Sequence, residues 1–132
     1  MRSNSRIQTE ISEGELLDRI SILEIKLNKI KDHAQLKEVK KEYEILNKLK
    51  QKHINSSKTI DLLYKDLKGT NEKIWIIENE KRLCEKNSDF KEKFIQICRN
   101  EYFANDKRAK IKREINKILD SYIKEVKQHI KY

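Results

Sequence analysis

The sequence contains no proline and only two glycines, Gly14 and Gly69, among its 132 residues. A fold of many short strands would need more turn residues than this, whereas a few long helices joined by short links need almost none. No run of about 18 consecutive apolar residues is present, so we expect no membrane span. The first ten residues also lack the apolar centre of a secretory signal peptide. Together these absences favour an all-α protein.

Cysteine and histidine are scarce as well, with Cys84, Cys98, His33, His53 and His129 as their only occurrences. Neither set has the spacing of a metal site. The glycine-rich phosphate loop and the GxSxG motif are also missing. We therefore expect no metal and no cofactor, and the sequence leaves open whether the protein is an enzyme. Two thiols without a disulfide framework are typical of a reducing cytosol, so we expect a cytoplasmic location.

Positive charge is in excess, because 31 Lys and Arg residues oppose 22 Asp and Glu residues and give a net charge of +9. One interpretation of this excess is a nucleic-acid or phosphate partner. The other is compositional, since the chain is crowded with Lys, Ile and Asn, the mixture that A/T-rich coding produces. No basic cluster is interleaved with stacking aromatic residues, as single-strand binders require. We therefore do not expect a nucleic-acid partner.

Helix signals divide the chain into an irregular arm of residues 1–10 and a helical domain of residues 11–132. Ser12 and Glu15 have the spacing of a capping box and predict a first helix over residues 12–30. Because this helix is apolar on more than one side, other helices should enclose it. A second helix is predicted from Asp32, and a third from residue 58 to residue 85. The apolar stripe of the third helix keeps its phase across Gly69, so the helix should continue through that glycine.

The last third of the chain leaves its helix boundaries open. Residues 87–89, Asn-Ser-Asp, predict the cap of a fourth segment. At Asn105 and Asp106 the pattern allows either one continuous helix or a new start. Apolar residues continue at helical spacing from Ala109 and become sparse near Asp120. The prediction is a single-domain antiparallel helical bundle of four or five helices.

The third predicted helix carries a second stripe that is polar and aromatic. It comprises Asn71, Trp75, Glu78 and Arg82 at helical spacing, and it holds the only tryptophan of the chain. Glu78 and Arg82 are one turn apart and predict an ion pair. We also predict that Glu15 and Arg19 of the first helix face this stripe.

Arginine is used sparingly in this lysine-rich chain, and most arginines lie inside predicted helices. A planar guanidinium makes bidentate bonds to a carboxylate or a phosphate, which lysine cannot reproduce. Two interpretations therefore stay open. The arginines either form buried pairs with carboxylates such as Asp18 and Asp106 or line an anion-binding groove, and the set comprises Arg19, Arg82, Arg99, Arg108 and Arg113. We expect Asp106 or Arg113 near the groove.

Three segments resemble a family of short, functionally uncharacterised bacterial and phage proteins. They are GELLDRISILEIKLNKI at 14–30, Asn71 with IWIIENEKR at 74–82, and YFANDKRAKIKREIN at 102–116. The resemblance covers residues 12 to 132 and implies no known activity, although such proteins are often encoded near glycosyltransferase genes for surface polysaccharide. Carried onto this chain, the motif residues are Glu15, Asp18, Arg19, Glu24, Lys26, Asn71, Trp75, Glu78, Arg82, Asn105, Asp106, Arg108, Lys112, Arg113 and Asn116.

Three functions are compatible with these features. The prediction is a non-catalytic interaction or scaffold module that binds a protein partner or a second copy, with an anion-binding groove on the condition that its arginines are not taken up by buried ion pairs. The first alternative is a small enzyme or binding protein for a phosphorylated or nucleotide-sugar metabolite in surface-polysaccharide biosynthesis, and the second is nucleic-acid binding. The candidate ligand-binding residues are Glu15, Asp18, Arg19, Asn71, Trp75, Glu78, Arg82, Asn105, Asp106, Arg108 and Arg113.

Overall fold

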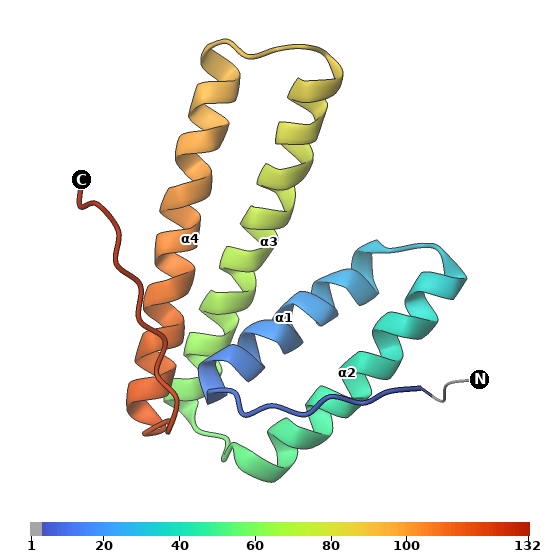
Figure 1. The fold of residues 1–132 in the computed structure, drawn as a ribbon, viewed down its shortest axis with the longest axis vertical. Helices are drawn as coiled ribbons and strands as arrows, with labels where there is room; N and C mark the ends of the chain where they lie inside the picture. Colours follow the sequence, from blue (N-terminus) through green and yellow to red (C-terminus); the bar gives the residue numbers. More distant parts are fainter. Residues whose placement is uncertain (1–3) are drawn as a thin grey trace.

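The computed structural model describes residues 4–132, which form four α-helices and no β-strand (Figure 1). The helices are α1 (Glu13–Lys29), α2 (His33–His53), α3 (Lys58–Lys86) and α4 (Glu92–Ile118). The first two form one antiparallel hairpin and the last two form a second, longer hairpin. The predicted all-α helical bundle is confirmed. Within residues 4–132, no helix has the apolar length that a membrane crossing needs.

Helix α1 is the element around which the other helices pack. It packs against α2, α3 and α4, whereas α2 packs mainly against α1 and reaches α3 through Lys50, whose ammonium lies 4.9 Å from the centre of the Tyr64 ring. Leu17 and Ile20 of α1 are fully buried, together with Leu67 of α3 and Ile115 of α4. Figure 1 shows α1 crossing the lower part of the α3–α4 hairpin. The expectation that this helix is enclosed by others is therefore confirmed, because its apolar residues occupy more than one side.

The α3–α4 hairpin extends well beyond the region that α1 covers (Figure 1). Its far half is held by a small cluster of Ile77, Cys84 and Ile97, against which Phe94 and Ala104 pack. Two helices alone bury only the sides that face each other. The outer sides of this half therefore remain open to solvent or to another molecule.

Side-chain caps explain where the first three helices begin. Each starts after a residue whose side chain accepts a backbone N–H three positions later, namely Ser12, Asp32 and Ser57. The predicted capping box at Ser12 is wrong in its second half. The Glu15 carboxylate binds Arg19 and Lys112 instead of reaching back to the Ser12 N–H.

The connection between α3 and α4 differs from the prediction. Asn87 ends α3 as its C-cap instead of starting a new helix, and Ser88 adopts a left-handed φ of 51°. Helix α4 begins only at Glu92 and lacks a side-chain cap. It then continues through Asn105 and Asp106 without a break. The described residues therefore contain four helices, and the fifth one that the sequence allowed does not form.

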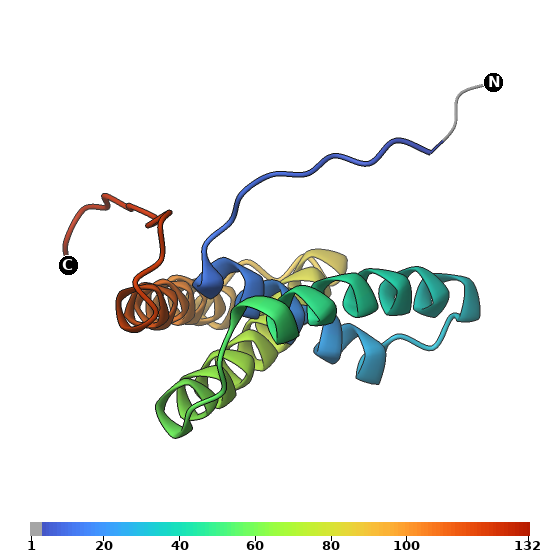
Figure 2. The ribbon, with the colours of Figure 1, turned by 90° about the horizontal axis from the view of Figure 1, so that it is seen from below.

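The arm of residues 4–12 and the C-terminal tail lie on the same side of the helices (Figure 2). Residues 4–12 have no regular secondary structure. The chain leaves α4 at Leu119, and Asp120 turns it with a left-handed φ of 49°. The tail then runs back along α4, and the ring of Tyr132 lies 5.5 Å from that of Phe103. The tail returns along α4 because Asp120 reverses its direction.

The two glycines have opposite surroundings. A Cβ added at Gly14 would lie 2.6 Å from Asn116 Oδ1 and 2.7 Å from the backbone oxygen of Lys112. The start of α1 is thus in direct contact with the backbone of α4. At Gly69, an added Cβ would meet no atom within 4 Å among the described residues other than its chain neighbours and the backbone of its own helical turns. Helix α3 passes through Gly69 as predicted, without a close contact at that position.

Alanine at these two positions should change stability in opposite directions. Gly14→Ala should lower the free energy of unfolding by about 2–3 kcal/mol, because Asn116 must move and lose its hydrogen bond to the Gly14 N–H. Gly69→Ala should raise it by up to about 1 kcal/mol through helix propensity. Urea denaturation of both variants beside the wild type measures the two effects. A Gly14→Ala variant of wild-type stability would contradict the close packing of α1 on α4.

Candidate functional site

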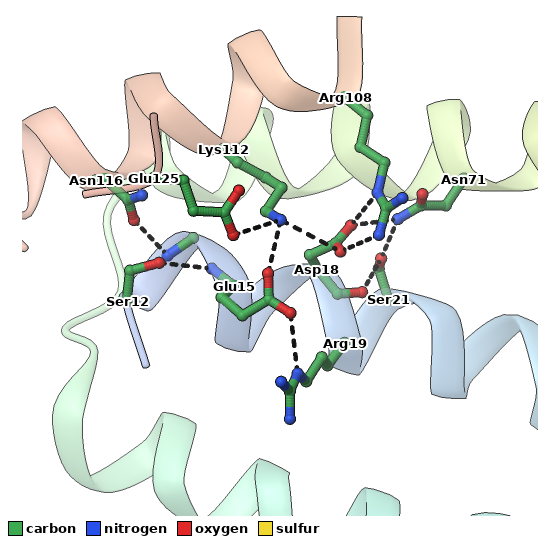
Figure 3. Close-up of polar contacts among 11 residues, drawn as sticks. Ser12, Glu15, Asp18, Arg19, Ser21, Asn71, Arg108, Lys112, Asn116 and Glu125 are labelled. Carbon is green, nitrogen blue, oxygen red and sulfur yellow. Dashed lines mark hydrogen bonds and ion pairs between the residues drawn. The ribbon is translucent and has the colours of Figure 1, made fainter. Parts of the chain in front are cut away.

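A buried carboxylate, that of Asp18, lies where α1, α3 and α4 meet (Figure 3). Arg108 of α4 donates its Nε to Oδ1 at 2.9 Å and its Nη2 to Oδ2 at 2.5 Å. Asn71 of α3 donates its Nδ2 to Oδ1 at 2.9 Å and to the Ser21 hydroxyl at 2.8 Å. The Ser21 hydroxyl in turn donates to the backbone oxygen of Asp18 at 2.7 Å. The charge pair and its hydrogen bonds therefore join three helices.

A second group of charges surrounds Lys112, one turn further along α4. Its ammonium donates to Glu15 at 2.6 Å and to Glu125 of the tail at 3.1 Å, and it lies 3.8 Å from Asp18 Oδ2. Arg19 also donates to Glu15, at 2.9 Å. Burial alone would raise the pKa of Glu15, but the hydrogen bonds from Lys112 and Arg19 outweigh it and lower the pKa to about 2.

The same contacts stabilise the charged forms of the two cations. Burial acts to lower the pKa of Lys112, but the hydrogen bonds to Glu15 and Glu125 more than compensate and raise it. The hydrogen bonds to Asp18 raise the pKa of Arg108 against the opposing effect of burial. Glu15, Lys112 and Arg108 are therefore all ionised near neutral pH. The cluster is an ion-pair network of complementary charges.

A groove of about 330 Å³ opens beside this network, between α1 and α3. Its lining comprises Ile22, Ile25, Asn71, Ile74, Trp75, Glu78, Asn79, Arg82 and Arg108. Isoleucine and tryptophan side chains supply its apolar surface, and Arg82 and Arg108 bring two guanidinium groups to the same groove. Arg82 is exposed and makes no hydrogen bond or ion pair with any residue in 4–132. Arg108 uses only its Nε and Nη2 groups to bind Asp18.

The groove brings together five of the eleven candidate residues, namely Asn71, Trp75, Glu78, Arg82 and Arg108. Asp18 binds two of these five, and Glu15 belongs to the adjacent Lys112 cluster. The remaining candidates lie outside the groove. Arg19, Asp106 and Arg113 are exposed, and Asn105 is half-buried on α4. The sequence pattern thus located one wall of the groove and the arginine that completes it.

Two predicted contacts are wrong. Glu15 and Arg19 do not face the polar stripe of α3, because Asp18 occupies that position and Arg19 points outwards with 48% of its side chain exposed. Glu78 and Arg82 do not form an ion pair, and the nearest cation to Glu78 is Lys81, at 3.8 Å. The physical reason is the rotation of α1. Its buried leucines and isoleucines face three neighbouring helices, and this orientation turns Asp18 towards α3 and α4.

Asp106 and Arg113, expected near the groove, also lie away from it. Asp106 accepts a hydrogen bond from the hydroxyl of Tyr132 in the tail. Arg113 makes no hydrogen bond or ion pair with the described residues. Both follow from the continuous α4, which leaves their sides of the helix facing outwards.

Several residues of the network were missed as site candidates. Lys112 and Asn116 were carried over by the family resemblance, but the emphasis on arginine left them out. Ser21 had a usable signal, because it is a small polar residue within an apolar stretch of α1. Glu125 had none, since it comes from the non-helical tail. Among residues 4–132, no group of three His, Cys, Asp or Glu side chains is arranged to hold a metal ion.

Fold and site together define a small helical protein in which a buried ion-pair network adjoins an arginine-lined groove. The chain belongs to the DUF6165 family, described as a family of unknown function, whose profile matches residues 7–131. The expected membership of a functionally uncharacterised family is thereby confirmed. No curated protein and no solved structure is significantly similar to the chain.

Proposed function

We propose that this protein is a non-catalytic binding module whose α1–α3 groove takes an anionic small molecule. The observation that supports this most directly is Arg82, which lies in the groove without a partner among the described residues. Arg108 beside it has donors left over after binding Asp18. Free guanidinium donors in a partly apolar groove fit the oxygens of a phosphate or a carboxylate.

The buried network supports the groove by fixing one of its two arginines. Asp18 holds the Arg108 guanidinium through two hydrogen bonds, so the side chain needs little further ordering when a ligand arrives. Arg82 has no such support and supplies an adaptable second contact. One ordered guanidinium at Arg108 and one guanidinium at Arg82 that is unpaired within residues 4–132 fit a ligand that binds reversibly.

The rest of the lining indicates what else the ligand carries. Trp75 offers a flat apolar surface, and Glu78 and Asn79 offer hydrogen-bonding groups. Because the Glu78 carboxylate repels anions, we place the anionic group at the arginines and hydroxyl groups of the ligand at Glu78. The volume, at the lower end of the range of about 300–1,000 Å³ for ligand pockets, suits a small metabolite.

A phosphorylated or nucleotide-sugar metabolite is the alternative within this class, as substrate or as ligand. The combination of Trp75 with Glu78 and Arg82 favours it over a bare inorganic anion. Binding is favoured over catalysis because the groove lining contains one carboxylate and neither histidine nor cysteine. Such a lining lacks the second group that paired acid–base catalysis needs.

The fluorescence of the single tryptophan tests the proposal directly, because Trp75 lines the groove. Titration with inorganic phosphate, a sugar phosphate and a nucleotide sugar should change the emission saturably for at least one of them, and the same ligand should raise the melting temperature. Arg82→Ala should weaken that binding by about tenfold or more. The melting temperature of the unliganded variant should stay unchanged, because Arg82 makes no hydrogen bond or ion pair within residues 4–132.

The matched control is Arg113→Ala, which removes an exposed arginine outside the groove and should bind like the wild type. A wild type that none of these anions perturbs would contradict the proposal. A destabilised Arg82→Ala variant would show instead that Arg82 holds the fold together.

A further inference from the structure

The side of α3 turned away from α1 exposes an apolar stripe that repeats every seven residues. Leu62, Ile76 and Leu83 are 59%, 51% and 52% exposed, and Gly69 occupies the remaining position of the repeat. At about 100° per residue, side chains seven positions apart lie on nearly the same side of a helix. Asn71, which binds α1, lies across the helix from them. A seven-residue apolar repeat on an exposed helix side supplies one of the two apolar positions that recur at helix–helix interfaces.

Helix α4 widens this apolar surface through Phe103, which is 43% exposed. Phe103 and Ile76 line the same hollow between α3 and α4. That hollow is continuous with a second one around Gly69, since both include Lys73 and Lys107. Leu62, Ile76 and Phe103 therefore line two adjoining hollows, and exposed apolar side chains gathered in this way mark an interaction site.

Charged residues of alternating sign flank the stripe. Asp66, Lys73 and Glu80 each follow an apolar or glycine position of the repeat by four residues. Asp66 is paired with Lys107 at 3.1 Å. Lys73 and Glu80 are exposed and make no hydrogen bond or ion pair within residues 4–132. One free charge of each sign therefore stands on the same flank of the stripe.

We propose that this stripe binds the same stripe of a second copy, with the two α3 helices antiparallel about a twofold axis at Ile76. Gly69 precedes Ile76 by seven residues and Leu83 follows it by seven. The axis therefore places Leu83 of each copy over Gly69 of the other, where the space next to the helix backbone is open among the described residues. A parallel pairing in register would instead set Gly69 against Gly69 and leave a gap.

The same axis satisfies the free charges and the aromatic residue of α4. In an antiparallel pair, equal flanks of the two helices meet, so Lys73 of each copy comes beside Glu80 of the other. Phe103 lies at the level of Ile76, because both line one hollow, and so the two Phe103 rings approach each other near the axis. Two α3–α4 hairpins then form an antiparallel four-helix arrangement around the apolar stripe. The α3 stripe and its flanking charges are therefore complementary to a second copy of themselves in both shape and charge.

Sedimentation of the full chain over a concentration series tests the proposal. We expect a monomer–dimer equilibrium, with a dissociation constant on the order of 10–100 µM because each copy carries a net charge of +9. Ile76→Glu should abolish the dimer and leave the melting temperature of the monomer unchanged, since Ile76 is half exposed. Ile45→Glu on α2, also half exposed but remote from α3, should associate like the wild type.

A charge exchange tests the antiparallel register. Lys73→Glu should weaken association by about tenfold or more, because it sets two carboxylates against each other at both ends of the interface. Adding Glu80→Lys should restore it, since the two pairs form again with their signs exchanged. Residues 73 and 80 make no hydrogen bond or ion pair within residues 4–132, so pairing between copies explains such a recovery.

A wild type that stays monomeric at about 1 mM would overturn the proposal, as would a dimer that persists in Ile76→Glu or a charge exchange without recovery. The outcome is independent of the anion-binding groove, which lies on the other side of α3. Trp75 fluorescence reports on that groove separately.

Discussion

Replacing Leu23 by aspartate should unfold the protein at room temperature. Leu23 lies in the middle of α1 and is 3% exposed. The substitution removes the burial of a leucine, which contributes about 2–5 kcal/mol, and places a carboxylate in a buried position, where a charge is costly. Because domains of this size are stable by about 5–15 kcal/mol, the combined loss approaches the whole stability. Loss of the helical far-UV circular dichroism signal at 25 °C measures the effect.

Ile45→Asp provides the matched control for this change. It introduces the same carboxylate into a helix, but Ile45 of α2 is 55% exposed. The free energy of unfolding should therefore change by less than about 1 kcal/mol. A Leu23→Asp variant that melts with the control would mean that α1 is not the central helix.

Replacing Arg108 by alanine should lower the free energy of unfolding by about 3–5 kcal/mol. The loss is large because Asp18 is only 1% exposed and would keep a buried charge without its main partner. Lys112 remains 3.8 Å from Asp18 and offsets a part of this cost. Chemical denaturation monitored by circular dichroism gives the magnitude.

Lys107→Ala is the control for this change. Lys107 is next to Arg108 in α4 and also pairs with an aspartate, Asp66, at 3.1 Å. Both side chains of that pair are 51% exposed, so Lys107→Ala should cost less than about 1 kcal/mol. Removing both buried charges with Asp18→Asn and Arg108→Gln should cost less than the sum of the single changes. Equal losses in Arg108→Ala and Lys107→Ala would show that water reaches Asp18.

Leu23 and the Asp18–Arg108 pair contribute to the fold in different ways. Leu23 belongs to the apolar burial that drives the helices together, whereas Asp18 and Arg108 act on how they are placed. The Asp18 network ties α1 to two helices through directed bonds, and it orients Arg108 at the mouth of the proposed anion site. A ligand bound there would contact a residue whose position depends on a carboxylate of another helix. Stability and binding should therefore be coupled through Arg108 and independent at Arg82.

The local features of the fold follow from residues close together in the chain. Ser12 and Asp32 cap their helices by accepting N–H groups three residues away. Each apolar stripe follows the helical period within the sequence of a single helix. The prediction was wrong at residues 87–89, because two local signals compete there. The same Asn-Ser-Asp stretch ends α3 instead of capping α4, and both uses satisfy polar backbone groups.

The helices, their apolar faces and the polar stripe that holds Asn71, Trp75 and Arg82 can be read from the sequence alone. Which groups meet depends on the tertiary packing, because the contacts that build the site span the chain. Asp18 and Arg108 are 90 residues apart, and Gly14 and Asn116 are 102 apart. Periodicity states which residues share a side of a helix, but the rotation of that helix depends on packing against all its neighbours at once. The rotation of α1 brought Asp18 inwards and left Arg19 outside.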